Sequence, residues 1–261
     1  LSNMAIGIGI GIGIPSGALN SNQSDGPVSP FPLANIISQY KFEDNALDTV
    51  GLNNGTATDV AYVPGLINKA VDLTAATSRV EVPSAADLSF NNGTTDIPFS
   101  FTFCVKFHTA PSSTNKPVFL NKKSTVDGSL AEYQIDHTNT EGFQFQITDP
   151  TFSNRLRVYK AFTPTLNQWY HFTITYDGSE TLGGMKIYFD GVEQTVSTAT
   201  SGTYTGMTAG SGDLVMGANA QNSGRTLDGE MDAVRIWNKE LSQTEVTDIA
   251  TAELAGTDIN P

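Results

Sequence analysis

Hydrophobic and polar residues alternate with a period of two along much of the chain, most clearly from residue 169 to 192. In the first part of this stretch, one set of alternate positions is strongly apolar and includes Phe172 and Ile174. Such alternation predicts a β-strand with two unlike faces. Asp177-Gly178 predicts a turn after this strand, and Asp190-Gly191 predicts a two-residue hairpin before a strand that begins at Val192.

Short strands are predicted in the rest of the chain as well, separated by loops rich in Gly, Asn, Ser and Thr. The clearest are 38–42, 70–73, 79–82, 99–107, 116–121, 131–136, 142–148, 156–161, 185–189, 213–217 and 230–237. One helix is predicted near the C-terminus, where Ser242 and Glu245 form a capping box and Val246, Ile249 and Ala250 supply an inward face. This pattern predicts an all-β sandwich with a short C-terminal helix.

The N-terminal segment has a different pattern and is predicted to lie outside the globular domain. Isoleucine alternates with glycine, and a Ser-, Asn-, Gly- and Pro-rich linker follows over residues 15–32. A strand of this kind exposes an apolar edge unless a partner covers it. We therefore divide the chain into an extended arm with its linker (1–34) and a globular domain (35–261). The predicted assembly residues are Ile6, Ile8, Ile10, Ile12 and Ile14, and the alternative is a flexible leader.

The composition excludes some functions. With 27 acidic and 14 basic residues, the formal charge is −13, which opposes binding to the phosphates of nucleic acids. No apolar run is long enough to span a bilayer. The single cysteine, Cys104, cannot form an intramolecular disulfide. It alternates with the phenylalanines of 99–107, so we expect a buried thiol on the opposite strand face.

Three stretches together resemble a known family. The segment from 169 to 192 contains the pattern W-x-H-x-x-x-T-Y-D-G followed by Y-x-D-G. Residues 40–57, Pro64-Gly65 and 79–83 fit upstream, and residues 229–246 fit downstream. The chain resembles laminin G-like domains of the concanavalin A-like jelly-roll group over roughly residues 36 to 254. The resemblance implies a two-sheet antiparallel jelly roll, a fold that hosts binding modules, enzymes and structural proteins.

The resemblance also implies a candidate metal site. Some members of this group bind Ca²⁺ with aspartates and backbone oxygens near the meeting point of the first and last strands. The matching residues here are Asp44, Asp48 and Asp232, although the acid that often follows the last of these is replaced by Ala233. Calcium is accordingly the predicted cofactor, and oxygen ligands of this type suit it.

The candidate ligand site lies on the polar faces of three predicted strands. Polar side chains alternate with apolar ones on each strand, and neighbouring strands would bring them together to hydrogen-bond and stack on sugars. The predicted ligand-binding residues are Gln134, Asp136, Gln144, Gln146, Arg155, Arg157 and Tyr159. The alternative is an ordinary solvated sheet face.

Catalysis is not favoured by the sequence. A retaining glycanase needs two carboxylates, and Glu230-Met231-Asp232 is an incomplete match to the E-x-D-x-E pattern. A jelly-roll lyase has a Q-I-H strand, whereas here Asp136 follows Gln134-Ile135 and the histidine comes one position late. His171 matches a framework position of the family, and no zinc-type cluster is visible. We predict a protein without enzymatic activity.

The leading hypothesis is a virion-associated bacteriophage protein, held to the particle by its arm, whose domain projects outward to decorate the shell or hold host glycans. With Met4 as the native start, no export signal precedes the domain, and a virion location or another non-standard route would account for work outside the cell. The alternative is a secreted bacterial carbohydrate-binding or adhesion module. A polysaccharide hydrolase or lyase is the third hypothesis. The predicted location is the virion surface or the extracellular space.

Overall fold

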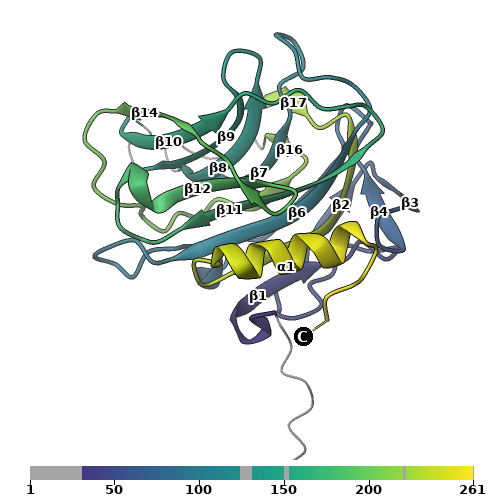
Figure 1. Cartoon of the computed structure of the whole chain (residues 1–261), viewed down its shortest axis with the longest axis horizontal. Coiled ribbons are helices and arrows are strands. Elements are labelled where there is room, and N and C mark those ends of the chain that lie inside the picture. Colours follow the sequence, from purple (N-terminus) through teal and green to yellow (C-terminus); the bar gives the residue numbers. More distant parts are fainter. Residues whose placement is uncertain (1–30, 124–130, 150–152, 220–221, 261) are drawn as a thin grey trace, which may run out of the picture.

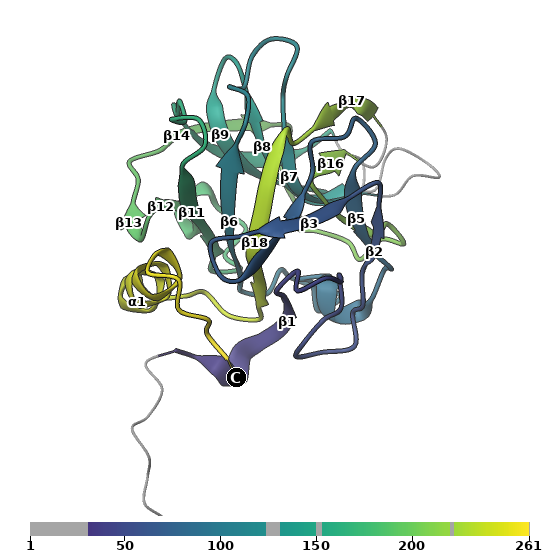
Figure 2. The same cartoon turned by 90° about the vertical axis from the view of Figure 1, so that its right-hand side faces the viewer.

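A computed structural model describes residues 31–123, 131–149, 153–219 and 222–260 of the chain. Two antiparallel sheets pack face to face, as the family resemblance implied, and a C-terminal helix lies outside them (Figures 1 and 2). The fold is therefore the expected all-β sandwich. The Ile–Gly segment falls outside the described residues, so its role in assembly stays a prediction.

Sheet A has eight strands in the described part of the chain, in the order β13-β12-β11-β6-β18-β4-β3, with β1 paired to β18. The bounds are β1 Ile36–Tyr40, β3 Ala61–Pro64, β4 Lys69–Asp72, β6 Phe99–Phe107, β11 Trp169–Tyr176, β12 Met185–Phe189, β13 Val192–Glu193 and β18 Gly229–Trp237. Strands distant in sequence are neighbours here, since β6 lies between β11 and β18.

Sheet B also has eight strands within the described ranges, in the order β14-β10-β9-β8-β7-β15-β5-β2. The bounds are β2 Thr56–Thr58, β5 Arg79–Val82, β7 Val118–Lys123, β8 Ala131–Thr138, β9 Gly142–Thr148, β10 Arg155–Lys160, β14 Ser197–Ser201 and β15 Leu214–Met216. A small hairpin joins β16 (Ala218–Asn219) and β17 (Asn222–Thr226), and short 3₁₀ turns occupy Leu33–Asn35, Ala86–Leu88 and Leu182–Gly184.

Alternation along the strands builds the core between the sheets. On β6, the four phenylalanines and Val105 point into the sandwich, where Phe99 stacks on Phe90 with ring centroids 4.2 Å apart. From sheet B, alternate residues of β8, β9 and β10 such as Ile135 and Phe145 complete the same cluster. Cys104 lies on the opposite face of β6 and is fully buried there. The prediction of a buried thiol behind a phenylalanine face is confirmed.

Helix α1 (Gln243–Leu254) covers part of the outer face of sheet A beside β11 and β13 (Figure 2). It begins with the predicted capping box, in which Ser242 and Glu245 exchange side-chain and backbone hydrogen bonds. Val246 and Ile249 are buried in a second apolar cluster that contains Trp237. Among the described residues, no helix has the length and apolarity that a membrane crossing requires.

The predicted hairpin at Asp190-Gly191 is also confirmed. Both residues have positive φ, 49° and 81°, the combination that a two-residue turn of this type requires and that glycine adopts without strain. The turn lies beside α1, because Gly191 O accepts hydrogen bonds from Gln243 and Thr247. Some strands differ from the predictions: β1 begins at Ile36 rather than at 38, and the short strands β2, β3, β14, β16 and β17 were not predicted.

Candidate functional site

The outer face of sheet B carries the predicted polar residues side by side. Strands β8, β9 and β10 are neighbours, and their register places Gln134 opposite Gln146 and Gln146 opposite Arg157. A second row joins Asp136 to Gln144. Neighbouring strands lie about 4.8 Å apart, so the polar groups of each row are close enough to contact one ligand together. The apolar residues between them point into the core.

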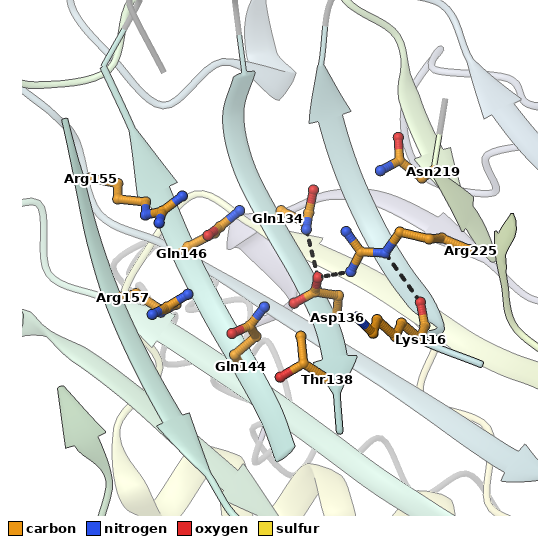
Figure 3. Close-up of a pocket in the computed structure, with 10 residues that line it drawn as sticks. All are labelled: Lys116, Gln134, Asp136, Thr138, Gln144, Gln146, Arg155, Arg157, Asn219 and Arg225. Carbon is orange, nitrogen blue, oxygen red and sulfur yellow. Dashed lines mark hydrogen bonds and ion pairs between the residues drawn. The ribbon is translucent and has the colours of Figure 1, made fainter. Parts of the chain in front are cut away.

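These rows form the floor of a cleft with a volume of about 400 Å³ (Figure 3). Figure 3 shows Arg155 and Arg157 on one side of the amide and carboxylate groups, and Arg225 and Lys116 on the other. The lining residues are Lys116, Gln134, Asp136, Thr138, Gln144, Gln146, Arg155, Arg157, Asn219 and Arg225. The structure thus brings together six of the seven residues predicted to bind a ligand. Tyr159 does not line the cleft, and the guanidinium of Arg157 lies 5.8 Å from its ring centroid.

Asp136 is bonded to two other residues that line the cleft. Its fully buried carboxylate forms an ion pair with Arg225 and accepts a hydrogen bond from Gln134 Nε2 at 2.6 Å. Arg225 also donates through Nε to the backbone oxygen of Lys116 at 3.3 Å. On the other side, Arg157 Nη2 pairs with Glu141 Oε1 at 2.8 Å. These contacts hold two guanidinium groups in place before any ligand arrives, which lowers the entropic cost of binding.

Several polar atoms of the cleft are buried without a hydrogen-bond partner. Gln134, Gln144 and Gln146 are only 4–6% exposed, so this surface differs from an ordinary solvated sheet face. Asp136 Oδ1, Gln144 Oε1 and Arg157 Nε make no hydrogen bond to any residue within the described ranges. Buried polar atoms of this kind are rare, because each costs free energy unless something pairs with it. The cleft therefore offers both acceptors and donors to a polar ligand.

Four lining residues were not predicted from the sequence. Thr138 continues the outward alternation of β8 by one more step, which the sequence pattern could have indicated. Lys116 precedes β7 and was seen only as the start of a predicted strand. Asn219 and Arg225 come from the β16–β17 hairpin. No local pattern in this Ser-, Gly- and Asn-rich region predicts that its arginine reaches across to Asp136.

The three predicted calcium ligands do not converge on one point. Asp44 is exposed and pairs with Lys69. Asp48 accepts four backbone N–H groups, from Gln39, Val50, Gly51 and Asn53. A carboxylate engaged in this way shapes a loop and has little capacity left for a cation.

Asp232 is equally occupied. It lies at a bulge of β18, where Ala233 has a φ of 51°. Its carboxylate accepts N–H groups from Ile67 at 2.9 Å and from Ala233. Burial raises the pKa of Asp232 to about 7. The residues present do not form a joint calcium site, and calcium binding by this chain stays a prediction.

One other group of potential metal ligands exists in the described part of the chain. Ligand atoms of Cys104, His171 and Glu253 lie within 4.8 Å of one another, and all three side chains are fully buried. Glu253 also forms a buried ion pair with Arg235. Because that guanidinium already neutralises the carboxylate and would repel a cation, this group serves as the polar contact between α1 and sheet A.

The residues that were considered for catalysis have other interaction partners in the structure. Glu230 forms an ion pair with Lys106 at 2.6 Å and lies 3.0 Å from His108 Nε2. His137 is turned away from the cleft, and its Nε2 is 2.9 Å from the backbone oxygen of Phe162. Burial lowers the pKa of His137. The cleft on sheet B therefore contains a single carboxylate and no imidazole among the residues that line it.

Comparison with known protein families identifies the superfamily to which this fold belongs. A family model described as the concanavalin A-like lectin/glucanases superfamily matches residues 75–247, about two thirds of the chain. The chain belongs to this superfamily. This confirms the resemblance inferred from the motifs around Trp169, His171 and Asp190. A search of the curated proteins gave no match.

Several solved structures are similar to this superfamily member. One is domain 4 of AbnA, a GH43 extracellular arabinanase from Geobacillus stearothermophilus, in complex with arabinotriose, with 19% identity, a TM-score of 0.61 and coverage of 83% of this chain and 98% of the other. The binding domain of Paraclostridial Mosquitocidal Protein 1 has 14% identity, a TM-score of 0.62 and coverage of 86% and 55%.

The binding domain of Botulinum Neurotoxin DC in complex with SialylT has 16% identity, a TM-score of 0.61 and coverage of 84% and 52%. The chain spans about half the length of these two toxin domains. At such identities the likeness shows the fold.

Proposed function

We propose that this protein is a non-catalytic saccharide-binding module whose ligand occupies the cleft on the outer face of sheet B. One observation carries the proposal: six polar residues from three adjacent strands line a single cleft with unpaired, buried hydrogen-bonding atoms. Sugars present dense arrays of hydroxyl donors and acceptors, and such arrays match rows of amide and guanidinium groups. The complex of a similar fold with arabinotriose supports the choice of ligand class.

The arrangement supports binding rather than cleavage. Retaining glycosidases need two carboxyl groups about 5 to 5.5 Å apart, and inverting enzymes also need a pair. Within the described residues that line the cleft, Asp136 is the only carboxylate, and Arg225 and Gln134 already engage it. A general acid would have to be protonated and free to approach the glycosidic oxygen. The described lining residues provide neither a free acid nor a second carboxylate.

Calorimetric titration of the full chain with a panel of soluble neutral and acidic saccharides tests the proposal. We expect at least one to bind, and Gln146→Ala to weaken that binding about tenfold, since Gln146 lies in the centre of the polar row. Gln194→Ala is the matched control, because Gln194 bonds to Val192 O at the edge of sheet A. A panel without any binder, or equal effects of the two variants, would refute the proposal. Reducing-end and unsaturated-sugar assays on the binders should stay at background.

A second part of the proposal concerns the structure to which the module is attached. We infer that the arm of residues 1–34 attaches the module to an assembly such as a bacteriophage particle, and a secreted adhesion module is the alternative. The alternation of isoleucine and glycine from Ile6 to Ile14 supports attachment, because a partner strand would cover its apolar face. Light scattering on the chain with and without residues 1–34 tests it. An oligomer that becomes a monomer on truncation supports attachment through the arm, and a monomer in both cases contradicts it.

A further inference from the structure

The charges around the cleft are opposite in sign to those of the whole protein. Ten of the described residues line the cleft, of which four are cationic (Lys116, Arg155, Arg157 and Arg225) and one is anionic. The chain as a whole has 14 basic and 27 acidic residues. A cationic patch in such an acidic protein creates a local field that attracts anions while the remaining surface repels them.

Two of the four cations have no acidic partner in the part of the chain that the structure describes. Arg225 pairs with Asp136, and Arg157 pairs with Glu141. Arg155 and Lys116 form no ion pair with any described residue, although both are half-buried at the cleft. Partial burial of a cation without a counter-charge is unfavourable, so an anionic ligand would relieve this cost at two points on opposite sides of the floor (Figure 3).

Among the described residues, the cleft also lacks an aromatic side chain of the kind that commonly holds a neutral sugar. Neutral pyranoses are commonly gripped by an aromatic ring, whose apolar face packs against the C–H groups of the sugar. None of the ten lining residues is aromatic, and Tyr159 packs beside Arg157 instead. Recognition must therefore depend on hydrogen bonds, and those between guanidinium groups and anions are the strongest.

We infer that the ligand of this cleft is an acidic saccharide, with carboxylate or sulfate groups that lie against Arg155, Arg157, Lys116 and Arg225. This inference rests on the proposed saccharide-binding function and adds the charge class of the ligand. Alternate positions on one strand are roughly 7 Å apart, so Arg155 and Arg157 can engage anionic groups on adjacent sugar units. The Gln134, Gln144 and Gln146 amides would then bond to the hydroxyls between them. The net charge of −13 opposes nucleic acids, which are longer anions that would pass over the acidic surface.

The probes are oligogalacturonides, the same oligosaccharides after chemical reduction of their carboxyl groups, and a sulfated galactan with its desulfated form. Each is titrated into the full chain at 20 mM and at 500 mM salt. We expect an acidic member to bind at least tenfold more tightly than its neutral counterpart at low salt, with the difference reduced at high salt. The uronate and sulfate pairs separate the two sources of negative charge.

The variant Arg155→Gln/Arg157→Gln tests the residues. We expect a loss of roughly 10- to 100-fold in affinity for the acidic probe and a clearly smaller loss for the neutral one, which keeps the amide contacts but loses two guanidinium donors. The matched control is Arg79→Gln/Lys186→Gln, which removes two positive charges that do not line the cleft. Arg155→Gln alone serves if the double variant unfolds, because this substitution leaves no described acidic residue without its partner.

The outcomes separate the two proposals. If acidic and neutral probes bind equally well and Gln146→Ala weakens both, saccharide binding stands and the preference for acidic ligands is wrong. If no probe binds, the proposed function itself fails. Tighter binding of a single-stranded oligonucleotide than of any saccharide, lost in the double variant, would overturn the inference and assign the cleft to nucleic acids.

Discussion

We expect Glu253→Gln, a substitution at the contact between α1 and sheet A, to cause a large loss of stability. Glu253 and Arg235 are both fully buried and form an ion pair through Oε1 and Nη1. Glu253 Oε2 lies 3.1 Å from His171 Nε2 and 3.7 Å from Cys104 Sγ. Burial lowers the pKa of His171 to about 3, so its ring is neutral at pH 7. The guanidinium is therefore the cation that balances Glu253.

The magnitude follows from what remains after the substitution. Removal of one partner of a buried pair leaves an uncompensated charge and costs about 3 to 5 kcal/mol. Arg235 would retain Asp258, whose side chain is 23% exposed, at 3.3 Å, and the backbone oxygen of Ile259 at 3.1 Å. These contacts place the expected loss near 3 kcal/mol, the lower end of that range. For a domain of this size, 1 kcal/mol shifts Tm by about 2 to 4 °C, so the melting temperature should fall by roughly 6 to 12 °C.

Urea and thermal unfolding followed by circular dichroism measure the effect. Glu240→Gln is the matched control, since it removes the same charge from a partly exposed pair with Lys186 and should cost less than about 1 kcal/mol. Arg235→Met/Glu253→Leu should recover much of the lost stability, because it removes both buried charges together. Equal stabilities of Glu253→Gln and Glu240→Gln would show that the buried pair does not hold α1 to the sheet.

Three further predictions concern single side chains. The folded pKa of Asp232 is about 7, above the ordinary value of 3.8. The folded state therefore binds a proton more tightly than the unfolded state, and the free energy of unfolding should fall as pH rises from about 4 to 7. The stability of Asp232→Asn relative to the parent should accordingly increase between pH 5 and pH 8, and a difference in urea unfolding that stays constant over this range would contradict the prediction. Ser242→Ala removes the helix cap and should lower the unfolding free energy by about 1 kcal/mol, whereas Ser179→Ala, in an exposed turn, should change it little. Asp48→Asn should cost about 1 to 3 kcal/mol by disturbing four backbone hydrogen bonds, but should leave any heat of calcium titration unchanged; loss of that heat would make Asp48 a ligand.

The fold could be predicted because its main signals are local. Alternation on β6, β8, β9 and β11 identifies strand faces directly, and the Asp190-Gly191 turn and the Ser242 cap are encoded within a few residues. Short strands such as β2 and β14 were missed because three to five polar residues at a sheet edge carry little apolar periodicity. Their pairing comes from the tertiary arrangement of their neighbours.

The candidate site was predictable only in part, because some of its residues are brought together by the tertiary structure and not by a local sequence pattern. Side chains on β8, β9 and β10 could be grouped because alternation fixes their face and the three strands follow one another in sequence. Arg225 is 89 residues from Asp136, and only the packed structure brings its hairpin to the cleft. The predicted calcium ligands are not grouped with one another in the described structure, and backbone N–H groups, which a sequence does not display, bond to Asp48 and Asp232.

The outer faces of the two sheets differ in whether their cations have acidic partners, and we expect one face to affect stability and the other to affect ligand binding. On sheet A, α1 supplies Glu253 to Arg235, so a buried cation is neutralised within the protein. On sheet B, Arg155 keeps its charge at the cleft without an acid among the described residues. A buried cation that is already neutralised makes the fold sensitive to the loss of its partner, whereas a cation left without a partner is available to a ligand. Glu253→Gln should therefore lower stability without changing the affinity of the folded protein for an acidic saccharide, and Arg155→Gln should do the reverse. If both variants change the same property, the two faces do not have separate roles.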